Sequence, residues 1–202
     1  MESTLREGGR EGVRLIETLL WDGMAYPRLA LHKTRLAAGS AAMGWGVPVW
    51  PALPAPEGAA RVRLTFGAAG DTAVEVAEVP ARKDLWRVGL AGAMLRSDDP
   101  WLRVKSTRRA VYDAARAGLA VGLDEAVFAN ERGEVCDGTI TTMFFDRGQG
   151  MRTPPLSCGL LPGVLRAEQG CPEEVLLVRD LPRVRLWVGN ALRGLCAAVW
   201  VE

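Results

Sequence analysis

Short strand-like runs, separated by turns that contain glycine or proline, alternate with a few helical segments along this chain, and this alternation limits the fold that it can adopt. Apolar residues at spacings of three, four and seven predict a helix from Leu29 to Met43. Strand patterns in the first half cover residues 14–21, 61–66, 72–79 and 85–90. Strands mixed with helices in this way indicate an α/β (α+β) protein.

The second half repeats the mixture after a break that we place near residues 91–100. Ser106 and Thr107 are good N-cap residues for a helix that ends at Gly118 to Gly122. Further along the chain, the patterns predict two strands within 124–145, a short helix that Gly170 ends, and strands at 175–178 and 184–201. We therefore predict an N-terminal α/β domain of residues 1–95 and a C-terminal domain of residues 96–202.

Length and charge agree with an ordinary globular protein. At roughly 150 residues per domain, 202 residues make one domain or two small ones. The formal net charge of +1 leaves no basic excess for nucleic acid or for an anionic membrane. No apolar run approaches the ~20 residues of a membrane span, and residues 1–10 lack an apolar signal segment, so we expect a cytoplasmic location.

The rare residues exclude several kinds of site. His32 is the only histidine and the four cysteines form no CxxC pair, which argues against zinc fingers, two-histidine metal sites and thioredoxin-like sites, so no metal is expected. The cysteines are instead expected to be reduced and mostly buried. A serine or cysteine hydrolase would need His32 as its base, and no GxSxG motif accompanies it. Primary amines come only from Lys33, Lys83 and Lys105.

Three features have the residue types that chemistry needs. Lys105 lies where a predicted strand meets a predicted helix, so a rigid backbone can aim its amine for covalent catalysis, although most lysines are simply solvated. Asp137 is the single acid in the apolar stretch 135–145 and is either a strand-edge residue or a partner for a heterocyclic nitrogen. The N–H groups that follow Pro162-Gly163 could hold a phosphate together with Arg35, although Pro-Gly before a helix is usually only a turn.

The order of these features resembles that of the class IV aminotransferase family, the fold type IV enzymes that use pyridoxal 5′-phosphate. The matching pieces span almost the whole chain and are Glu17-Thr18, Asp22-Gly23, Leu29-x-x-His32-x-x-Arg35-Leu36, Lys105-Ser106-Thr107-Arg108-Arg109, Asp124-Glu125, Gly133-Glu134-Val135-Cys136-Asp137-Gly138-Thr139, Thr153-Pro154-Pro155-Leu156, Gly159-Leu160-Leu161-Pro162-Gly163 and Gly189-Asn190-Ala191-Leu192-Arg193-Gly194. The resemblance implies two α/β domains of the D-amino-acid aminotransferase-like type, with the cofactor in the cleft between them, and a homodimer.

The resemblance also implies roles for single residues. Lys105 would bind the cofactor covalently and then move the proton at the substrate's α-carbon, Asp137 would pair with the pyridine nitrogen, and Arg35 would bind the phosphate. The full set of implied cofactor-binding residues is Arg35, Lys105, Asp137, Leu161, Val164 and Leu165. Candidates for contact with an amino-acid-like substrate are Thr18, Arg109, Tyr112 and Arg193.

Four positions depart from the family pattern. Asp137 stands where glutamate is usual, so its carboxylate is one methylene shorter. Thr142 replaces a common asparagine, Leu165 a threonine that binds phosphate, and Ala191 a serine or threonine. Because a hydrogen bond to a charged group contributes about 1.5–3 kcal/mol, the changes at 165 and 191 are expected to weaken cofactor binding without abolishing it.

The pocket around the cofactor decides between two reactions. The compact length and the motifs 136–139 and 190–194 are most similar to short bacterial members grouped with 4-amino-4-deoxychorismate lyase, which release 4-aminobenzoate and pyruvate on the route to folate. One alternative is an amino-acid transaminase of branched-chain or D-amino-acid type that uses 2-oxoglutarate. Another is a non-catalytic member that binds a small metabolite or a partner.

Overall fold

The computed structural model describes residue 5 and residues 11–202, and the chain forms two compact units. Residues 1–81 and 100–108 make up the first unit, and residues 82–99 and 109–202 make up the second. The sequence pattern predicts one break near residue 95, whereas the two units exchange short segments around it. The reason is pairing: strand 85–90 hydrogen-bonds into the sheet of the second unit, and residues 105–107 bond to the backbone of the first.

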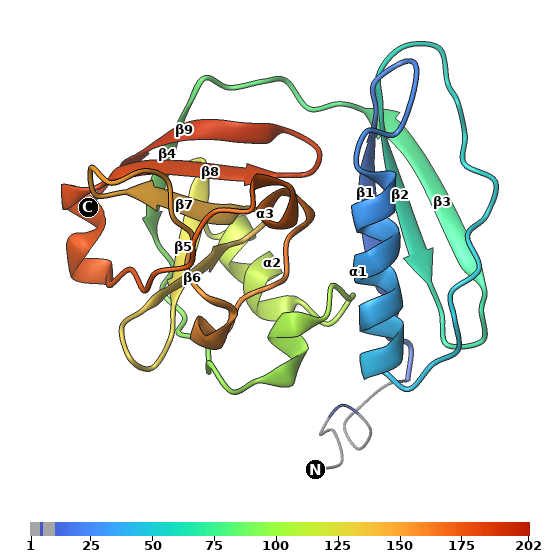
Figure 1. The fold of residues 1–202 in the computed structure, drawn as a ribbon, viewed down its shortest axis with the longest axis horizontal. Helices are drawn as coiled ribbons and strands as arrows, with labels where there is room; N and C mark the ends of the chain where they lie inside the picture. Colours follow the sequence, from blue (N-terminus) through green and yellow to red (C-terminus); the bar gives the residue numbers. More distant parts are fainter. Residues whose placement is uncertain (1–4, 6–10) are drawn as a thin grey trace. The chain divides into compact units, whose positions relative to one another are not determined.

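Among its described residues, the first unit contains a three-stranded antiparallel sheet in the order β1-β2-β3 and one α-helix. Its elements are β1 (Leu15–Trp21), α1 (Leu29–Ala42), β2 (Ala60–Phe66) and β3 (Thr72–Glu78). The alternating burial along β2 shows that one face of the sheet is covered, and α1 lies along β1 (Figure 1). Apolar side chains of β1, β2 and α1 form the core of this unit, because each element has an apolar face and needs a partner for it.

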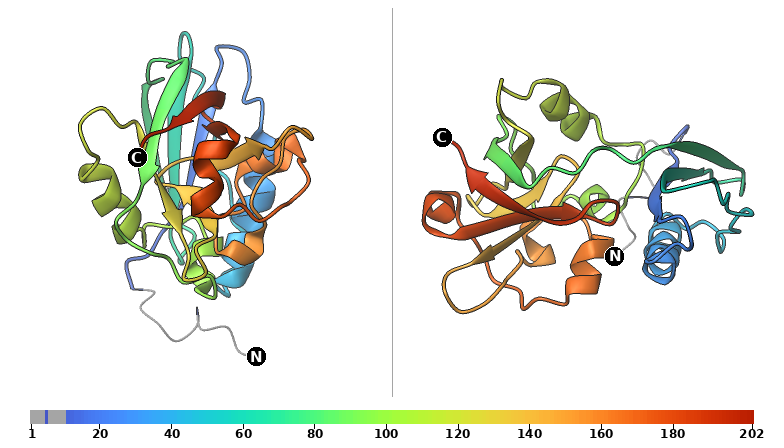
Figure 2. Two further views of the ribbon diagram at one scale, coloured as in Figure 1. Left: turned by 90° about the vertical axis from the view of Figure 1, so that its left-hand side faces the viewer. Right: turned by 90° about the horizontal axis from the view of Figure 1, so that it is seen from above.

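The second unit contains a six-stranded mixed sheet in the order β6-β5-β4-β9-β8-β7. Its strands are β4 (Leu85–Leu90), β5 (Glu125–Ala129), β6 (Val135–Gly138), β7 (Thr142–Asp146), β8 (Arg185–Asn190) and β9 (Gly194–Trp200). The central strand β4 runs parallel to β5 and β9, and the other pairs are antiparallel. Figure 2 shows β8 and β9 as a hairpin from two further directions.

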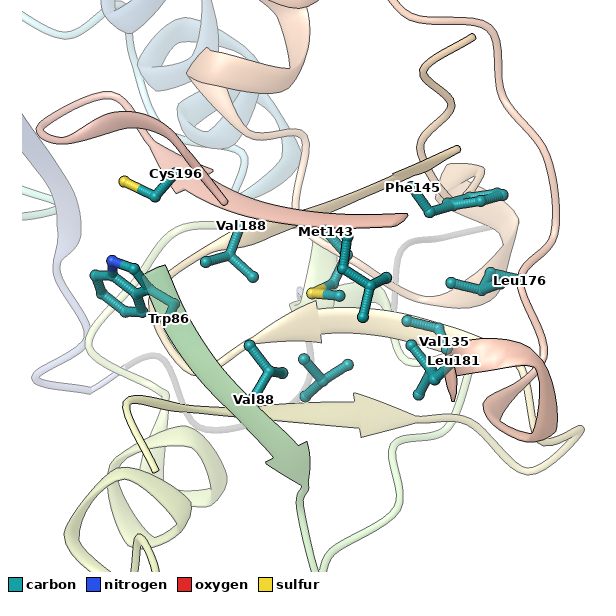
Figure 3. Packing of buried hydrophobic residues seen from close by; sticks show 11 residues of the cluster. Trp86, Val88, Val135, Met143, Phe145, Leu176, Leu181, Val188 and Cys196 are labelled. Atoms are coloured by element: carbon teal, nitrogen blue, oxygen red, sulfur yellow. The ribbon is translucent and has the colours of Figure 1, made fainter. Parts of the chain in front are cut away.

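The core of the second unit gathers side chains from the central strands, from β6 and β7, and from the chain before β8. Trp86, Val88, Met143 and Val188 are among its members, and Figure 3 shows how they pack together. Two helices, α2 (Ala110–Ala117) and α3 (Val164–Gln169), belong to this unit. Short 3₁₀ turns occupy Leu156–Cys158 and Val178–Arg183 here and Pro100–Arg103 in the first unit.

Three local predictions differ from the structure. The second-half helix begins after Arg109, since Ser106 forms a β-bridge with Leu15 and the Thr107 N–H donates to the Arg14 carbonyl. Residues 124–145 contain three strands instead of two, with a loop at 139–141 between β6 and β7. Residues 175–178 form no named strand, because Val178 begins a 3₁₀ turn.

The prediction that most of the cysteines are buried is confirmed. All four are free thiols, and Cys136, Cys158 and Cys196 are buried. Among the described residues, none of the helices has the length and apolar character that crossing a membrane requires.

Candidate active site

Lys105 is held by backbone pairing against β1 in the first unit. The Ile16 N–H donates to the Lys105 carbonyl at 2.9 Å, and Ser106 forms a β-bridge with Leu15. Val104 and Ser106 are buried, and Val104 belongs to the core that α1 covers. Because side chains alternate along an extended backbone, Lys105 points to the opposite face and is half-buried there. The backbone hydrogen bonds thus hold the Cα atom of Lys105, from which the amine extends, in a fixed position.

The face that carries Lys105 also carries two arginines that the sequence interpretation missed. Thr18 of β1 lies opposite Arg63 of β2, and Leu20 lies opposite Arg61, so these side chains share the face away from α1. Arg61 and Arg63 are half-buried, and the buried Nε of Arg61 has no hydrogen-bond partner among the described residues. The alternation Arg61-Val62-Arg63 in a predicted strand was the signal that could have revealed this pair.

Arg35 lies in a buried cluster on the other face of β1. Its Nε and Nη2 donate to Oε1 and Oε2 of Glu17 at 3.0 and 2.6 Å. His32 lies one turn earlier on α1, and its Nδ1 is 2.5 Å from Oε2 of the same carboxylate. The spacing of three residues between His32 and Arg35 puts both on one side of the helix, where Glu17 meets them.

The charges in this cluster explain its protonation. Burial raises the pKa of Glu17, but the charge of Arg35 and the hydrogen bonds from His32 and Arg35 outweigh it, so the pKa lies below its ordinary value of 4.5. Burial lowers the pKa of His32 below 6.5, although the contact with Glu17 opposes this, and the charges of Arg35 and Lys105 lower it further. Neutral His32 therefore carries its proton on Nδ1 and donates it to an ionised Glu17.

Asp137 lies on β6 in the second unit, 5% exposed. Its Oδ2 accepts a hydrogen bond from the Leu161 N–H at 2.8 Å, which ties β6 to the loop before α3. The loop that follows Asp137 is held by Glu125, a fully buried carboxylate on β5. Glu125 accepts hydrogen bonds from the Thr139 N–H at 3.0 Å and from the Thr141 hydroxyl at 2.7 Å. The sequence interpretation assigned no role to Glu125, although an acid that opens an apolar strand was visible.

The first turn of α3 packs unusually close to the sheet. A Cβ added to Gly163, the residue before the helix, would lie 2.5 Å from Oγ1 of Thr142 on β7. A Cβ on Gly189 of β8 would lie 2.4 Å from Cδ2 of Leu165. Glycine at both positions therefore allows the start of α3, with the N–H groups of Val164 and Leu165, to sit directly against β7 and β8.

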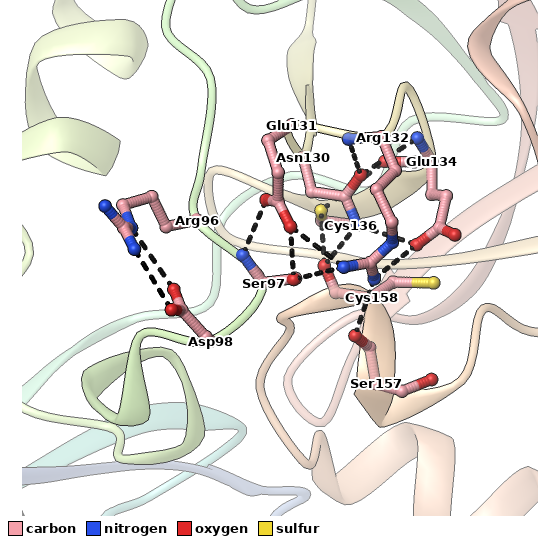
Figure 4. A network of polar contacts seen from close by, with 10 residues as sticks. All are labelled: Arg96, Ser97, Asp98, Asn130, Glu131, Arg132, Glu134, Cys136, Ser157 and Cys158. Atoms are coloured by element: carbon pink, nitrogen blue, oxygen red, sulfur yellow. Dashed lines mark hydrogen bonds and ion pairs between the residues drawn. The ribbon is translucent and has the colours of Figure 1, made fainter.

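A polar network braces the loop that leads to α3. Arg132, in the turn between β5 and β6, donates to Oε2 of Glu134 at 2.7 Å and to the Ser157 carbonyl at 3.0 Å (Figure 4). Asn130 donates to the same Glu134 oxygen at 2.8 Å and to the Cys158 carbonyl at 2.9 Å. The hydrogen bond from Arg132 lowers the pKa of Glu134 to about 2, so the carboxylate stays ionised and the loop stays anchored.

The remaining predicted residues have structural contacts in the second unit. Arg109 donates to Asp113 at 2.7 Å and to the Thr139 carbonyl at 3.0 Å, so it fastens α2 to the loop after β6. Tyr112 packs edge-on against Phe128 with ring centroids 4.9 Å apart, and burial raises its pKa above the ordinary value. The Arg193 guanidinium lies 5.5 Å from the ring centroid of Trp86. Their proposed contact with substrate stays a prediction.

Comparisons with known proteins agree with the motif order. The family model described as amino-transferase class IV matches residues 14–198. Among solved structures, one described as a "Putative amino-acid aminotransferase from Mesorhizobium loti" is 39% identical, with 94% of this chain and 100% of that chain covered and a TM-score of 0.86. A comparison with curated proteins found no match.

Two further solved structures share the fold at lower identity. One, from Legionella pneumophila, is described as a "Putative 4-amino-4-deoxychorismate lyase" and is 18% identical, with 94% and 83% of the two chains covered and a TM-score of 0.77. The other is the PLP-bound form of a hypothetical aminotransferase from Mycobacterium tuberculosis, 22% identical, with 93% and 81% covered and a TM-score of 0.73. The match over residues 14–198 places this chain in the class IV aminotransferases, a family of enzymes that use pyridoxal 5′-phosphate.

Proposed function

We propose that this enzyme is a 4-amino-4-deoxychorismate lyase-like protein that eliminates pyruvate and yields 4-aminobenzoate. The observation that carries the proposal is the shared face of Lys105, Arg61 and Arg63 in the first unit. The substrate of this lyase has an amino group and two carboxylates, and two guanidinium groups on the same face of the sheet as an amine suit the two carboxylates.

The described residues fit pyridoxal 5′-phosphate. Lys105 offers an amine on a fixed backbone, and Asp137 offers a buried carboxylate of the type that pairs with a pyridine nitrogen. Arg35 and the first N–H groups of α3 are donors of the kind that bind a phosphate dianion. The close approach at Gly163, which any Cβ would block, fixes the start of α3 against β7.

Each residue then has one task in the reaction. When bound, the cofactor supplies the electron sink for the carbon that loses its proton. The Lys105 amine takes that proton and holds it, and Asp137 keeps a proton on the ring nitrogen. In the lyase reaction the carbon–oxygen bond to the enolpyruvyl group then breaks, and this group takes up a proton and leaves as pyruvate. Arg61 and Arg63 orient the two carboxylates while this happens.

A second candidate is an amino-acid transaminase that uses 2-oxoglutarate. The 39% identity to the Mesorhizobium loti protein favours it, and the two carboxylates of 2-oxoglutarate suit the same arginine pair. In a transaminase Lys105 would move the proton that it takes from the amino-acid substrate, and no bond to a leaving group would break.

Product analysis separates the two candidates. The purified enzyme with added pyridoxal phosphate is given 4-amino-4-deoxychorismate, and the formation of 4-aminobenzoate and pyruvate is measured. In a parallel assay it is given amino acids with 2-oxoglutarate, and glutamate is measured. We expect 4-aminobenzoate. Glutamate without 4-aminobenzoate would reject the lyase and support the transaminase.

An absorption spectrum tests the non-catalytic alternative. A protein that binds the cofactor through Lys105 develops a visible absorption band when pyridoxal phosphate is added. The absence of that band would favour a member that binds a metabolite or a partner without catalysis. The homodimer and the cytoplasmic location also stay predictions, and sedimentation of the purified protein tests the first.

A further inference from the structure

The cluster of Glu17, His32 and Arg35 places a carboxylate and a guanidinium inside the core of the first unit, where apolar side chains are usual. Glu17 interrupts the face of β1 on which Leu15 and Leu19 pack, and it is 1% exposed, as is His32. A buried ion pair stabilises a fold little more than apolar residues of similar size, because desolvation offsets the attraction. Folding alone therefore gives no reason for a carboxylate at position 17.

The geometry of the ion pair suggests the reason. Glu17 occupies the edge of the guanidinium formed by Nε and Nη2, with both oxygens engaged. A guanidinium is planar, so fixing one edge fixes the direction of the neighbouring edge formed by Nη1 and Nη2. That second edge can donate two parallel hydrogen bonds to a phosphate. The Arg35 side chain is 11% exposed, so most of it is held inside the first unit.

His32 fixes the carboxylate in turn. Its Nδ1 donates to Oε2 of Glu17, the same oxygen that receives Nη2 of Arg35. The carboxylate cannot rotate without losing one of these contacts. Arg35 is thus oriented by a chain of two buried side chains on two elements.

We propose that Glu17, held by His32, is a positioning residue that aims Arg35 at the phosphate group of the cofactor. This inference rests on the role of Arg35 in the proposed function. The positioning role and charge alone predict opposite changes in phosphate affinity when the charge of Glu17 is removed. Glu17 is an anion beside a phosphate site, so removing its charge would tighten phosphate binding if charge alone mattered, whereas loss of orientation weakens it.

Equilibrium dialysis of the apoprotein with two probes tests the proposal. Pyridoxal 5′-phosphate reports the phosphate contact, and pyridoxal, which lacks the phosphate, reports everything else. We expect Glu17→Gln to weaken binding of pyridoxal 5′-phosphate by about tenfold or more, the loss of one aligned charge-assisted hydrogen bond, and to leave pyridoxal binding within about twofold. Glu75→Gln, an exposed carboxylate on β3 of the same sheet, is the matched control and should change neither.

Further variants separate the possible failures. Arg35→Gln should show at least that loss, and the double variant with Glu17→Gln should lose no more than Arg35→Gln alone, because Glu17 acts through Arg35. If Arg35→Gln leaves binding unchanged, the assignment of Arg35 in the proposed function fails. If Arg35→Gln weakens binding but Glu17→Gln tightens it or leaves it unchanged, only the positioning role is rejected.

Substitution of His32 tests the positioning role without changing Glu17, so a folding defect of the Glu17 variant does not affect the result. His32→Asn retains an N–H donor near the place of Nδ1 and should bind pyridoxal 5′-phosphate like the natural protein. His32→Leu removes the donor and should weaken binding of pyridoxal 5′-phosphate but not of pyridoxal. Equal binding by both His32 variants would contradict the proposal.

Discussion

Lys105 differs from the other two lysines in the way its backbone is held. Lys83 is exposed and pairs with Asp124, and Lys33 lies over the ring of Trp50 at 5.9 Å. Lys105 instead follows a residue of the core and is hydrogen-bonded through its carbonyl to β1. Because the backbone of Lys105 is held in place, its amine can occupy the same position in each turnover. A residue that binds the cofactor covalently and also acts as the base requires this.

This difference predicts a selective effect of two alanine substitutions. Lys105→Ala should lower product formation by at least about 10²-fold, the usual contribution of a general base, and should abolish the visible band seen with pyridoxal phosphate. Lys83→Ala should leave both unchanged, because exposed ion pairs contribute little. Absorption spectra and product assays on both variants check this. A visible band in Lys105→Ala would show that another group binds the cofactor.

Asp137 allows charge and length to be varied separately. Asp137→Asn keeps the shape and the hydrogen bond from Leu161 but removes the charge, so it should lower both cofactor affinity and activity, the latter by about tenfold or more, since a hydrogen bond to a charge contributes about 1.5–3 kcal/mol. Asp137→Glu restores the usual family acid and should tighten cofactor binding or leave it unchanged. Titration with pyridoxal phosphate measures both. A large loss in Asp137→Glu would mean that the shorter acid is matched to its surroundings.

At the scale of secondary structure, α3 shows how a six-residue helix is placed by glycine. Its N-cap residue Gly163 has ordinary dihedral angles, φ −65° and ψ 141°, so the need for glycine comes from the close approach of Thr142 and not from the backbone. The Pro-Gly motif was visible in the sequence. Its partner on β7, Thr142, lies 21 positions earlier and was not visible, because only the packing of α3 against the sheet brings the two together.

A double-mutant cycle tests this contact. Gly163→Ala should destabilise the protein by about 1–3 kcal/mol, the usual cost of overpacking, because the new Cβ falls within 2.5 Å of the Thr142 hydroxyl. Adding Thr142→Ala removes that hydroxyl and should recover most of the loss. Gly92→Ala, where a Cβ meets nothing within 4 Å, is the control. Urea unfolding measures the natural protein, Gly163→Ala, Thr142→Ala, the double variant and the control, and an equal loss in Gly163→Ala and the double variant would contradict the packing argument.

For the whole molecule, buried and paired ionisable groups set the response to acid. The pKa of His32 lies below 6.5 in the folded state, so the unfolded chain binds more protons as the pH falls below 6.5 and the free energy of unfolding decreases. The pKa values of Glu17 and Glu134 lie below 4.5, and Glu134 reaches about 2, so their contributions are present above 4.5 and are lost on further acidification. The charged groups that shift the pKa of His32 are Glu17, Arg35 and Lys105.

Melting temperatures at several pH values check this order. We expect a plateau above pH 6.5 and a decline below it. His32→Asn should flatten the part of the decline that lies between 6.5 and 4.5 and leave the part below 4.5, where the carboxylates titrate. A melting temperature in the natural protein that stays constant down to pH 4.5 would show that His32 is not coupled to folding.

The local sequence patterns of this chain were sufficient to predict most helices and strands and the family to which it belongs. The helix from Leu29, the strands 61–66, 72–79 and 85–90, and the order of the motifs around Lys105 and Asp137 all depend on neighbours in sequence, and they were predicted. Periodicity and turn residues act over a few positions, so they are visible without a fold.

Long-range pairing decided the rest. Because Ser106 forms a β-bridge with Leu15, α2 begins later than the sequence predicts, and residues 100–108 belong to the first unit. No local pattern in the sequence reports such a bond. The same holds for the partners of Arg35, since Glu17 is eighteen residues away and reaches it only because α1 lies on β1. Local propensity predicts the elements, whereas the partners of a residue follow from packing between distant elements. For that reason roles could be assigned to Glu17, Glu125 and Arg61 only from the folded chain.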